Sequence, residues 1–149
     1  MKKIFVIFLI SAVVGCGQKG MDMIFFQKVI GHEKLGSKYK ALFIVPGAGC
    51  QGCITGAEIF IKKNIDQYED VLFVFTSIKS MKILRMSIGT NILEKNNVLL
   101  DSTNVFFNYA KEKNIYPTIV YLDNGNVNRV EYISPENKYS ITQLMDIYD

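Results

Sequence analysis

The chain has 149 residues, with 17 basic and 14 acidic residues and a net charge of +3. This length fits one domain with a sizeable core. The small net charge, without a basic stripe, gives no indication of nucleic-acid binding. No internal repeat or low-complexity segment is visible, so the function has to be sought in local motifs.

The N-terminus has the pattern of an export signal. A positive segment, Met1 to Lys3, precedes a run over 4–14 that is almost entirely apolar. This run is short for a transmembrane helix, which takes roughly 20 residues. We therefore predict a secretory signal over residues 1–15.

The end of this signal indicates lipidation. Val13-Val14-Gly15-Cys16 resembles the lipobox of bacterial lipoproteins, in which small residues precede a cysteine. That resemblance implies cleavage after Gly15, a lipid on Cys16 and a protein anchored to a bacterial membrane, on the periplasmic side or at the cell surface. An ordinary signal peptide with a chance cysteine is the alternative. The sequence does not distinguish the inner from the outer membrane.

Residues 16–37 form a lipidated tether and lead-in segment in our interpretation. Residues 17–20 read as a short polar tether, and residues 21–30 are apolar without a clear period, which does not separate helix from strand. A polar loop over 31–39 follows, in which His32 is expected to be solvated. We place the folded domain at 38–149.

The domain opens with its most informative stretch. The unbroken apolar run 41–45 predicts a buried strand, and a glycine-rich loop follows it. Apolar residues then recur at helical spacing up to Ile65. Cys50 and Cys53 therefore fall where the loop becomes the helix.

Further elements follow in order. The run 71–75 predicts a second buried strand, parallel to the first in a βαβ unit. Helical spacing follows in 81–88, and a short strand is expected at 97–100. Asn104 is expected to cap a helix with an apolar face at 105–110. The sequence closes with a strand at 118–122, an Asn-Gly hairpin, a strand at 127–133 and a final helix from Ser140 to Tyr148.

The two cysteines indicate redox chemistry. The helix N-terminus offers free N–H groups and a favourable dipole to an anion such as a thiolate, so Cys50 is the candidate nucleophile and Cys53, one turn further, the resolving thiol. Two cysteines at this spacing can also close a small disulfide. Strand, loop, Cys-x-x-Cys and helix is the redox arrangement of the thioredoxin fold.

A second segment carries the resemblance further. Asn114-Ile115-Tyr116-Pro117-Thr118-Ile119-Val120-Tyr121-Leu122-Asp123-Asn124-Gly125 looks like the thioredoxin-superfamily segment in which a cis-proline opens a strand leading to a hairpin. With Cys50-Gln51-Gly52-Cys53, the match covers residues 38–149. It is most similar to exported, membrane-anchored thioredoxin-like proteins of the thiol-specific antioxidant type. It implies an α/β fold, a thioredoxin-like three-layer α/β/α sandwich with a central mixed sheet, and a cis-Pro117 beside Cys50.

The resemblance implies a periplasmic or cell-surface thiol–disulfide oxidoreductase, with a reductase of protein disulfides favoured over an oxidase or isomerase. Its partners would be protein thiols and disulfides and an unidentified redox donor, with no metal or cofactor. The chain departs from the family by having Gly49 where a Trp is frequent and Gln51-Gly52 between the cysteines. These departures affect redox potential and partner choice.

Other interpretations of the same residues stay open. Cys50–Cys53 would be a structural staple in a non-catalytic thioredoxin-fold binding module at the membrane, although staples usually close longer loops. Two cysteines and a distant His32 are too few for the four ligands of a zinc site. Glu58 reads as an exposed helix charge, with a carboxylate that assists proton transfer as the alternative.

Overall fold

A computed structural model describes residues 17–35, 38–107, 112–137 and 141. The expected signal, Cys16, and most of the expected final helix lie outside these residues. The elements in chain order are α1 (Gly17–His32), β1 (Ala41–Pro46), α2 (Gln51–Asn64), η1 (Ile65–Gln67), β2 (Val71–Thr76), α3 (Met81–Ile88), α4 (Thr90–Leu93), β3 (Val98–Asp101), η2 (Glu112–Ile115), β4 (Thr118–Asp123) and β5 (Asn126–Tyr132).

One mixed sheet in the order β3-β2-β1-β4-β5 forms the centre of the molecule. β1 pairs in parallel with β2, and β2 pairs in parallel with β3. β4 runs antiparallel to β1, and β5 antiparallel to β4. The predicted βαβ unit and the Asn-Gly hairpin are therefore confirmed.

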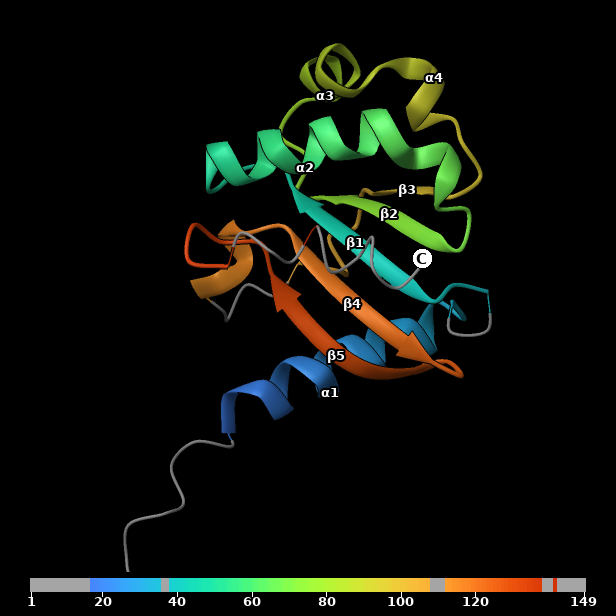
Figure 1. Cartoon of the computed structure of the whole chain (residues 1–149), viewed down its shortest axis with the longest axis vertical. Helices are drawn as coiled ribbons and strands as arrows, with labels where there is room; N and C mark the ends of the chain where they lie inside the picture. Colours follow the sequence, from blue (N-terminus) through green and yellow to red (C-terminus); the bar gives the residue numbers. More distant parts are fainter. Residues whose placement is uncertain (1–16, 36–37, 108–111, 138–140, 142–149) are drawn as a thin grey trace, which may run out of the picture.

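Helices cover both faces of this sheet (Figure 1). α2, α3 and α4 lie on one face, and α1 lies on the other. The arrangement is a three-layer α/β/α sandwich of the thioredoxin-like kind, as the sequence predicts. All six residues of β1 and all six of β2 are buried, because both faces of these strands are covered.

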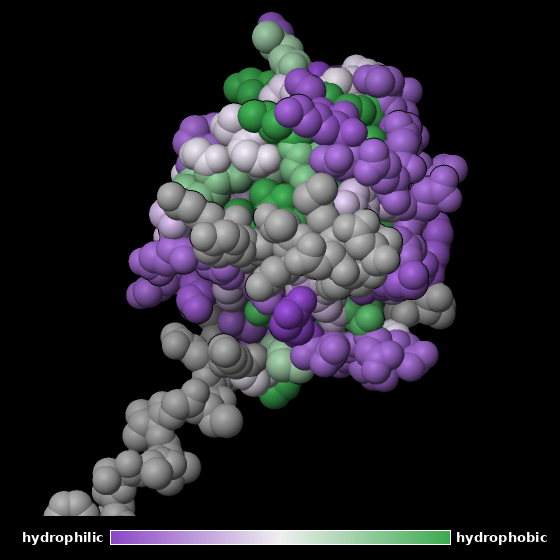
Figure 2. All heavy atoms as spheres, viewed as in Figure 1, coloured by the Kyte–Doolittle hydropathy of each residue, from purple (hydrophilic) through white to green (hydrophobic). Residues whose placement is uncertain are grey.

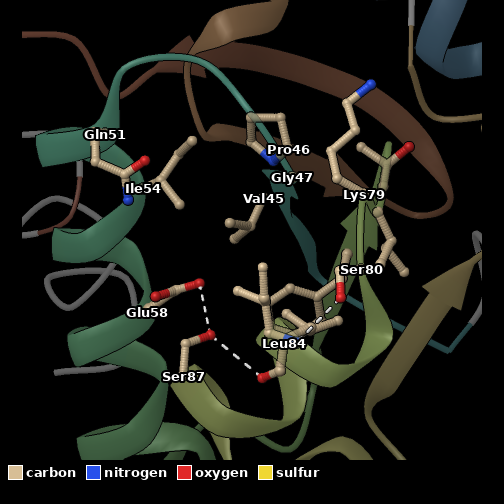
Figure 3. A pocket seen from close by; sticks show the side chains of 14 residues that line it. Val45, Pro46, Gly47, Gln51, Ile54, Glu58, Lys79, Ser80, Leu84 and Ser87 are labelled. Atoms are coloured by element: carbon tan, nitrogen blue, oxygen red, sulfur yellow. Dashed lines mark hydrogen bonds between the residues drawn. The ribbon is translucent and has the colours of Figure 1, made fainter.

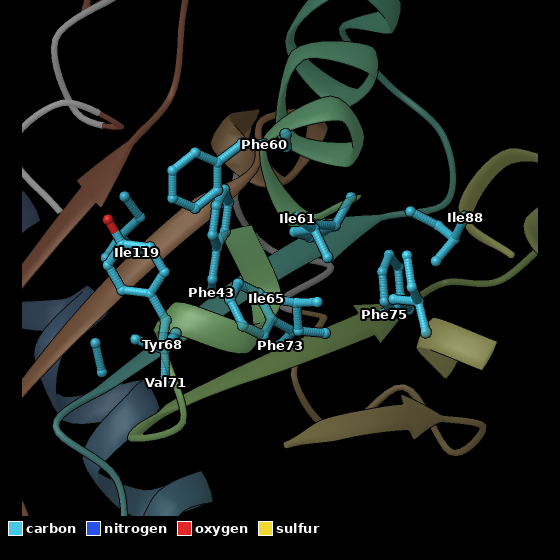
Figure 4. Close-up of a cluster of buried hydrophobic side chains, with 14 of the residues drawn as sticks. Phe43, Phe60, Ile61, Ile65, Tyr68, Val71, Phe73, Phe75, Ile88 and Ile119 are labelled. Atoms are coloured by element: carbon cyan, nitrogen blue, oxygen red, sulfur yellow. The ribbon is translucent and has the colours of Figure 1, made fainter. Parts of the chain in front are cut away.

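The core consists of two apolar clusters, one on each side of the sheet, because successive residues of a strand point to opposite faces. Phe43 packs with α2 on one face, where its ring centroid lies 5.8 Å from that of Phe60 and 5.9 Å from that of Phe73. Figure 4 shows this cluster beneath α2. Leu42 joins the cluster on the other face, together with Phe26 of α1.

Residues 21–30, for which the sequence did not separate helix from strand, are part of the helix α1. The expected polar tether at 17–20 is wrong, because these residues form the first turn of the helix. Phe26 and Ile30 are buried against the sheet. The Gln27 side-chain nitrogen donates to the Gly125 carbonyl at 3.4 Å, and the Val127 amide donates to Gln27 Oε1 at 2.6 Å. α1 is therefore fastened to the β4–β5 hairpin.

The segment after β3 differs from the expected Asn104-capped helix. Asn104 has a positive φ of 58°, and its side chain accepts from the Ser77 amide at 2.9 Å. The amides of Val105 and Phe106 donate to the Asp101 carboxylate at 3.0 and 2.9 Å instead. Residues 105–107 are not helical, and the rest of the expected helix lies outside the described residues.

Candidate active site

The two cysteines form a disulfide at the N-terminus of α2. Cys50 is the N-cap residue of this helix and Cys53 lies in its first turn. Their Cα atoms are 5.3 Å apart, within the range that a disulfide needs. Both residues are partly buried, so burial does not separate an accessible cysteine from a protected one. The expected placement at the start of the helix is confirmed.

Two glycines before Cys50 leave room for the backbone of other loops to pack closely against this segment. A Cβ on Gly47 would lie 2.3 Å from the Ser77 carbonyl oxygen, and one on Gly49 would lie 2.2 Å from the Ile115 carbonyl oxygen. Gly49 also has a φ of +147°, which side chains disfavour. These glycines therefore let the protein's own backbone approach the disulfide loop from both sides.

The segment before β4 lies directly beside the disulfide. The Cys50 amide donates to the Ile115 carbonyl at 2.9 Å, which brings the predicted Pro117 loop to the cysteines. Ile115 is 45 % exposed and adds an apolar side chain at this edge.

The expected cis bond before Pro117 is wrong. The described residues contain no cis peptide bond, so Tyr116–Pro117 is trans, the form that X–Pro bonds prefer by about 0.5–1 kcal/mol. The Pro117 carbonyl accepts from the Ile133 amide at 2.8 Å, which ties the start of β4 to the chain after β5. The segment is where the resemblance places it, but its conformation differs.

The charges on α2 suit an anion at its N-terminus. The first turn has no acidic residue, and Lys62 and Lys63 lie in the last turn. Negative charge is stabilised near a helix N-terminus and positive charge near its C-terminus. A Cys50 thiolate, formed when the disulfide is reduced, would therefore be stabilised by the backbone of α2.

A pocket of about 190 Å³ lies beside the disulfide, between α2 and α3. Gln51, which follows the first cysteine, and Ile54, which follows the second, line one side, and Lys79 lines the other (Figure 3). Glu58 also lines it, and Ser87 Oγ donates to Glu58 Oε1 at 3.1 Å. The expectation that Glu58 is an exposed helix charge is therefore wrong, because Glu58 is a partly buried pocket residue. A role in proton transfer stays the alternative interpretation.

Sequence reasoning missed two parts of this site. The hydrogen bond from the Cys50 amide to the Ile115 carbonyl could not be predicted, because a contact between backbone groups does not depend on a particular side chain. The pocket depends on how α3 lies against α2, and helical spacing alone does not fix that packing. His32 was expected to be solvated, and its side chain is 81 % exposed, next to Glu33.

Fold and site together define an α/β sandwich of thioredoxin-like architecture with a Cys-x-x-Cys disulfide at a helix N-terminus. Comparison with protein-family models, with curated proteins and with solved structures found no match to this chain. Among the described residues, no three His, Cys, Asp or Glu side chains gather in a way that would hold a metal ion. No described helix has the length and hydrophobicity needed to cross a bilayer.

Proposed function

We propose that this protein is an exported thiol–disulfide oxidoreductase related to the anchored thioredoxin-like proteins, and that it reduces disulfides in other proteins. The observation that carries the proposal is the Cys50–Cys53 disulfide at the N-terminus of α2, the position that stabilises a thiolate. A disulfide that closes so short a loop contributes less to folding than one that closes a long loop, which leaves chemistry as the better reason for it.

The reaction proceeds in two exchange steps. The Cys50 thiolate attacks one sulfur of a substrate disulfide, which forms a mixed disulfide and releases the first substrate thiolate. The Cys53 thiolate then attacks Cys50 Sγ and releases the second one. Two electrons pass from the Cys50–Cys53 dithiol to the substrate, and a dithiol protein in the same compartment returns them to the site.

The surroundings of the disulfide suit a polypeptide substrate. The adjacent pocket is smaller than the roughly 300–1,000 Å³ of typical small-molecule sites. Its size fits a side chain next to the substrate cysteine, and the exposed Ile115 on the other side offers a second apolar contact.

Trapping tests this mechanism. We expect Cys53→Ser to accumulate mixed disulfides with other proteins, because Cys50 attacks but nothing resolves the product. The matched variant Cys50→Ser should trap almost none. The reduced wild-type protein should reduce insulin, and alkylation at mildly acidic pH should modify Cys50 first. Trapping by Cys50→Ser, or faster alkylation of Cys53, would contradict the assigned roles.

We also propose that Cys16 carries the lipid that anchors the protein. The support is the lipobox-like sequence ending at Cys16. The Cys16→Ser protein should lose labelling by a palmitate analogue and should remain an uncleaved precursor. Unchanged labelling in Cys16→Ser would overturn this part and leave the redox proposal untouched.

A second candidate function is a binding module with a structural disulfide. The observation in its favour is the trans Tyr116–Pro117 bond, at the place where the resemblance implies a cis bond. This candidate predicts a disulfide that resists dithiothreitol in the folded protein and no trapping by either cysteine variant. That result would replace the enzyme with the module.

A further inference from the structure

α1 presents apolar side chains to the outside as well as to the core. Ile24 is 70 % exposed and Met21 is 54 % exposed, three residues apart on the face that turns away from the buried Phe26 and Ile30. In Figure 2, hydrophobic surface appears at the lower end of the molecule, where α1 lies. Ile83 and Met86 of α3 are exposed to a similar degree, so exposure alone does not select α1, and its charge and its place in the chain have to decide.

The charges on α1 fit a negatively charged surface. Lys28 follows Ile24 by one turn and is exposed on the same face. Asp22 is the only acidic residue of α1, and it is buried, with 7 % of its surface exposed. The outer face of α1 therefore combines apolar side chains with a positive charge, and α1 has no exposed carboxylate that would oppose an anionic lipid headgroup.

The position of this face in the chain identifies the partner. α1 begins at Gly17, the residue after Cys16, so no linker separates the helix from the proposed lipid. With a rise of 1.5 Å per residue, Met21 and Ile24 lie about 6 and 10 Å along the helix from Gly17. This face therefore starts close to the proposed anchor, and interfacial helices that lie along the membrane bury their apolar face about 5–10 Å into the boundary between headgroups and acyl chains.

We propose that the outer face of α1, formed by Met21, Ile24 and Lys28, lies in the lipid interface of an anionic membrane. The lipid anchor proposed at Cys16 would bring this face to the membrane, and the redox chemistry plays no part in the proposal. In this orientation α1 lies between the domain and the bilayer and holds the domain flat against the membrane surface. Because α1 and α2 cover opposite faces of the sheet (Figure 1), the helix that carries the disulfide is turned away from the lipid.

Single tryptophans test this orientation, since the chain contains no Trp. Ile24→Trp places a reporter on the proposed face. Met86→Trp is the matched control, because Met86 is 76 % exposed on α3, on the other side of the sheet. Both full-length proteins would be processed in cells, purified and reconstituted into phosphatidylethanolamine–phosphatidylglycerol vesicles with or without brominated acyl chains, which quench indole emission.

We expect the Ile24→Trp emission to shift to shorter wavelength and to lose most of its intensity with brominated lipid, while the Met86→Trp emission keeps the intensity and wavelength of an indole in water. Adding Lys28→Glu to Ile24→Trp should reduce the quenching. A water-like, unquenched indole in vesicle-bound Ile24→Trp protein would overturn the proposal.

Two further measurements on the same samples separate this proposal from the others. Labelling by palmitate reports the anchor, and reduction of insulin reports the redox function. If Cys16 carries no lipid, quenching of the Ile24→Trp indole in vesicle-bound protein still supports the membrane face, and a water-like indole in vesicle-bound protein still refutes it.

Discussion

At the residue scale, Gly49 is the position where the disulfide loop tolerates least change. Gly49→Ala would place a Cβ at a φ of +147° and 2.2 Å from the Ile115 carbonyl oxygen. We expect a loss of about 2–4 kcal/mol in the free energy of unfolding, from backbone strain and from displacement of the Ile115 segment. Urea denaturation of the oxidised protein measures this change.

The matched control is Gly56→Ala, because Gly56 is also close to the disulfide in the sequence, three residues after Cys53. A Cβ at Gly56, inside α2, would meet nothing within 4 Å. Because alanine favours a helix more than glycine, we expect a gain of about 0.5–1 kcal/mol. Equal effects of the two substitutions would show that the contact between Gly49 and Ile115 is not what makes Gly49 necessary.

Tyr121 gives the molecule a sensitivity to alkali. Burial first, and then the nearby Glu131 carboxylate, raise the pKa of Tyr121 from 10.0 to about 12, although Arg129 acts against this shift. The neutral phenol is favoured in the folded state, so its contribution to stability is complete below pH 10 and is lost as the pH rises towards 12.

Titration of phenolate absorbance checks this prediction. Tyr121→Phe should lose an ionisation step near pH 12 and should lose less stability in alkali than the wild type. Glu131→Gln should move that step to lower pH, because it removes one of the charges that oppose ionisation. Ionisation of Tyr121 near pH 10.0, its ordinary pKa, would contradict the prediction.

At the scale of elements, the sequence predicted the parts whose signal is local. The apolar runs of β1 and β2 are buried on both faces, and the turn between β4 and β5 lies at Asn124-Gly125. α1 escaped prediction because it has apolar side chains on its outer as well as its inner face, which removes the helical period. The sequence also did not predict that the Val105 and Phe106 amides donate to Asp101. Asp101 and Asn104 are both residue types that cap helices well, and only the fold decides which of them accepts these hydrogen bonds.

Asp101 links β2, β3 and the turn that follows β3. Its carboxylate is buried and accepts from Thr76 Oγ1 at 2.8 Å, as well as from the Val105 and Phe106 amides. We expect Asp101→Ala to lower the free energy of unfolding by about 3 kcal/mol, because several buried donors lose their acceptor.

The control for Asp101 is a carboxylate at the surface. Asp66 pairs with Lys95, and its side chain is 79 % exposed. Asp66→Ala should change the stability by no more than about 1 kcal/mol, as is usual for exposed ion pairs. Urea denaturation of both variants makes the comparison, and similar losses would mean that Asp101 is not a structural centre.

At the scale of the whole molecule, the redox state of the site should change stability only modestly. The core consists of two clusters, one on each face of the sheet, and neither cluster includes the cysteines. Closing a loop of about four residues stabilises the folded protein by roughly 2 kcal/mol in the chain-entropy model. We therefore expect the oxidised protein to melt roughly 4–8 °C above the reduced protein.

The direction of this difference bears on the proposed reductase. A disulfide that stabilises the fold is harder to reduce, by about 40 mV for this free energy. Calorimetry of the oxidised and the reduced protein measures this difference in melting temperature. The double variant Cys50→Ser and Cys53→Ser is the control, because its melting temperature should not change when reductant is added. A reduced form that melts higher than the oxidised form would make the protein an oxidant and overturn the proposed direction.

The contact between Gln27 and the β4–β5 hairpin also sets an order of events in folding. The two hydrogen bonds of Gln27 span 98 and 100 residues of sequence, so a chain made from its N-terminus has synthesised α1 long before its partners exist. Contacts of such long range are slow to form, because a large loop must close first. α1 is the first of the described helices to be synthesised. Phe26 and Ile30 can pack against β1 and β2 early, but the contacts of α1 with the hairpin have to wait until β4 and β5 have been made.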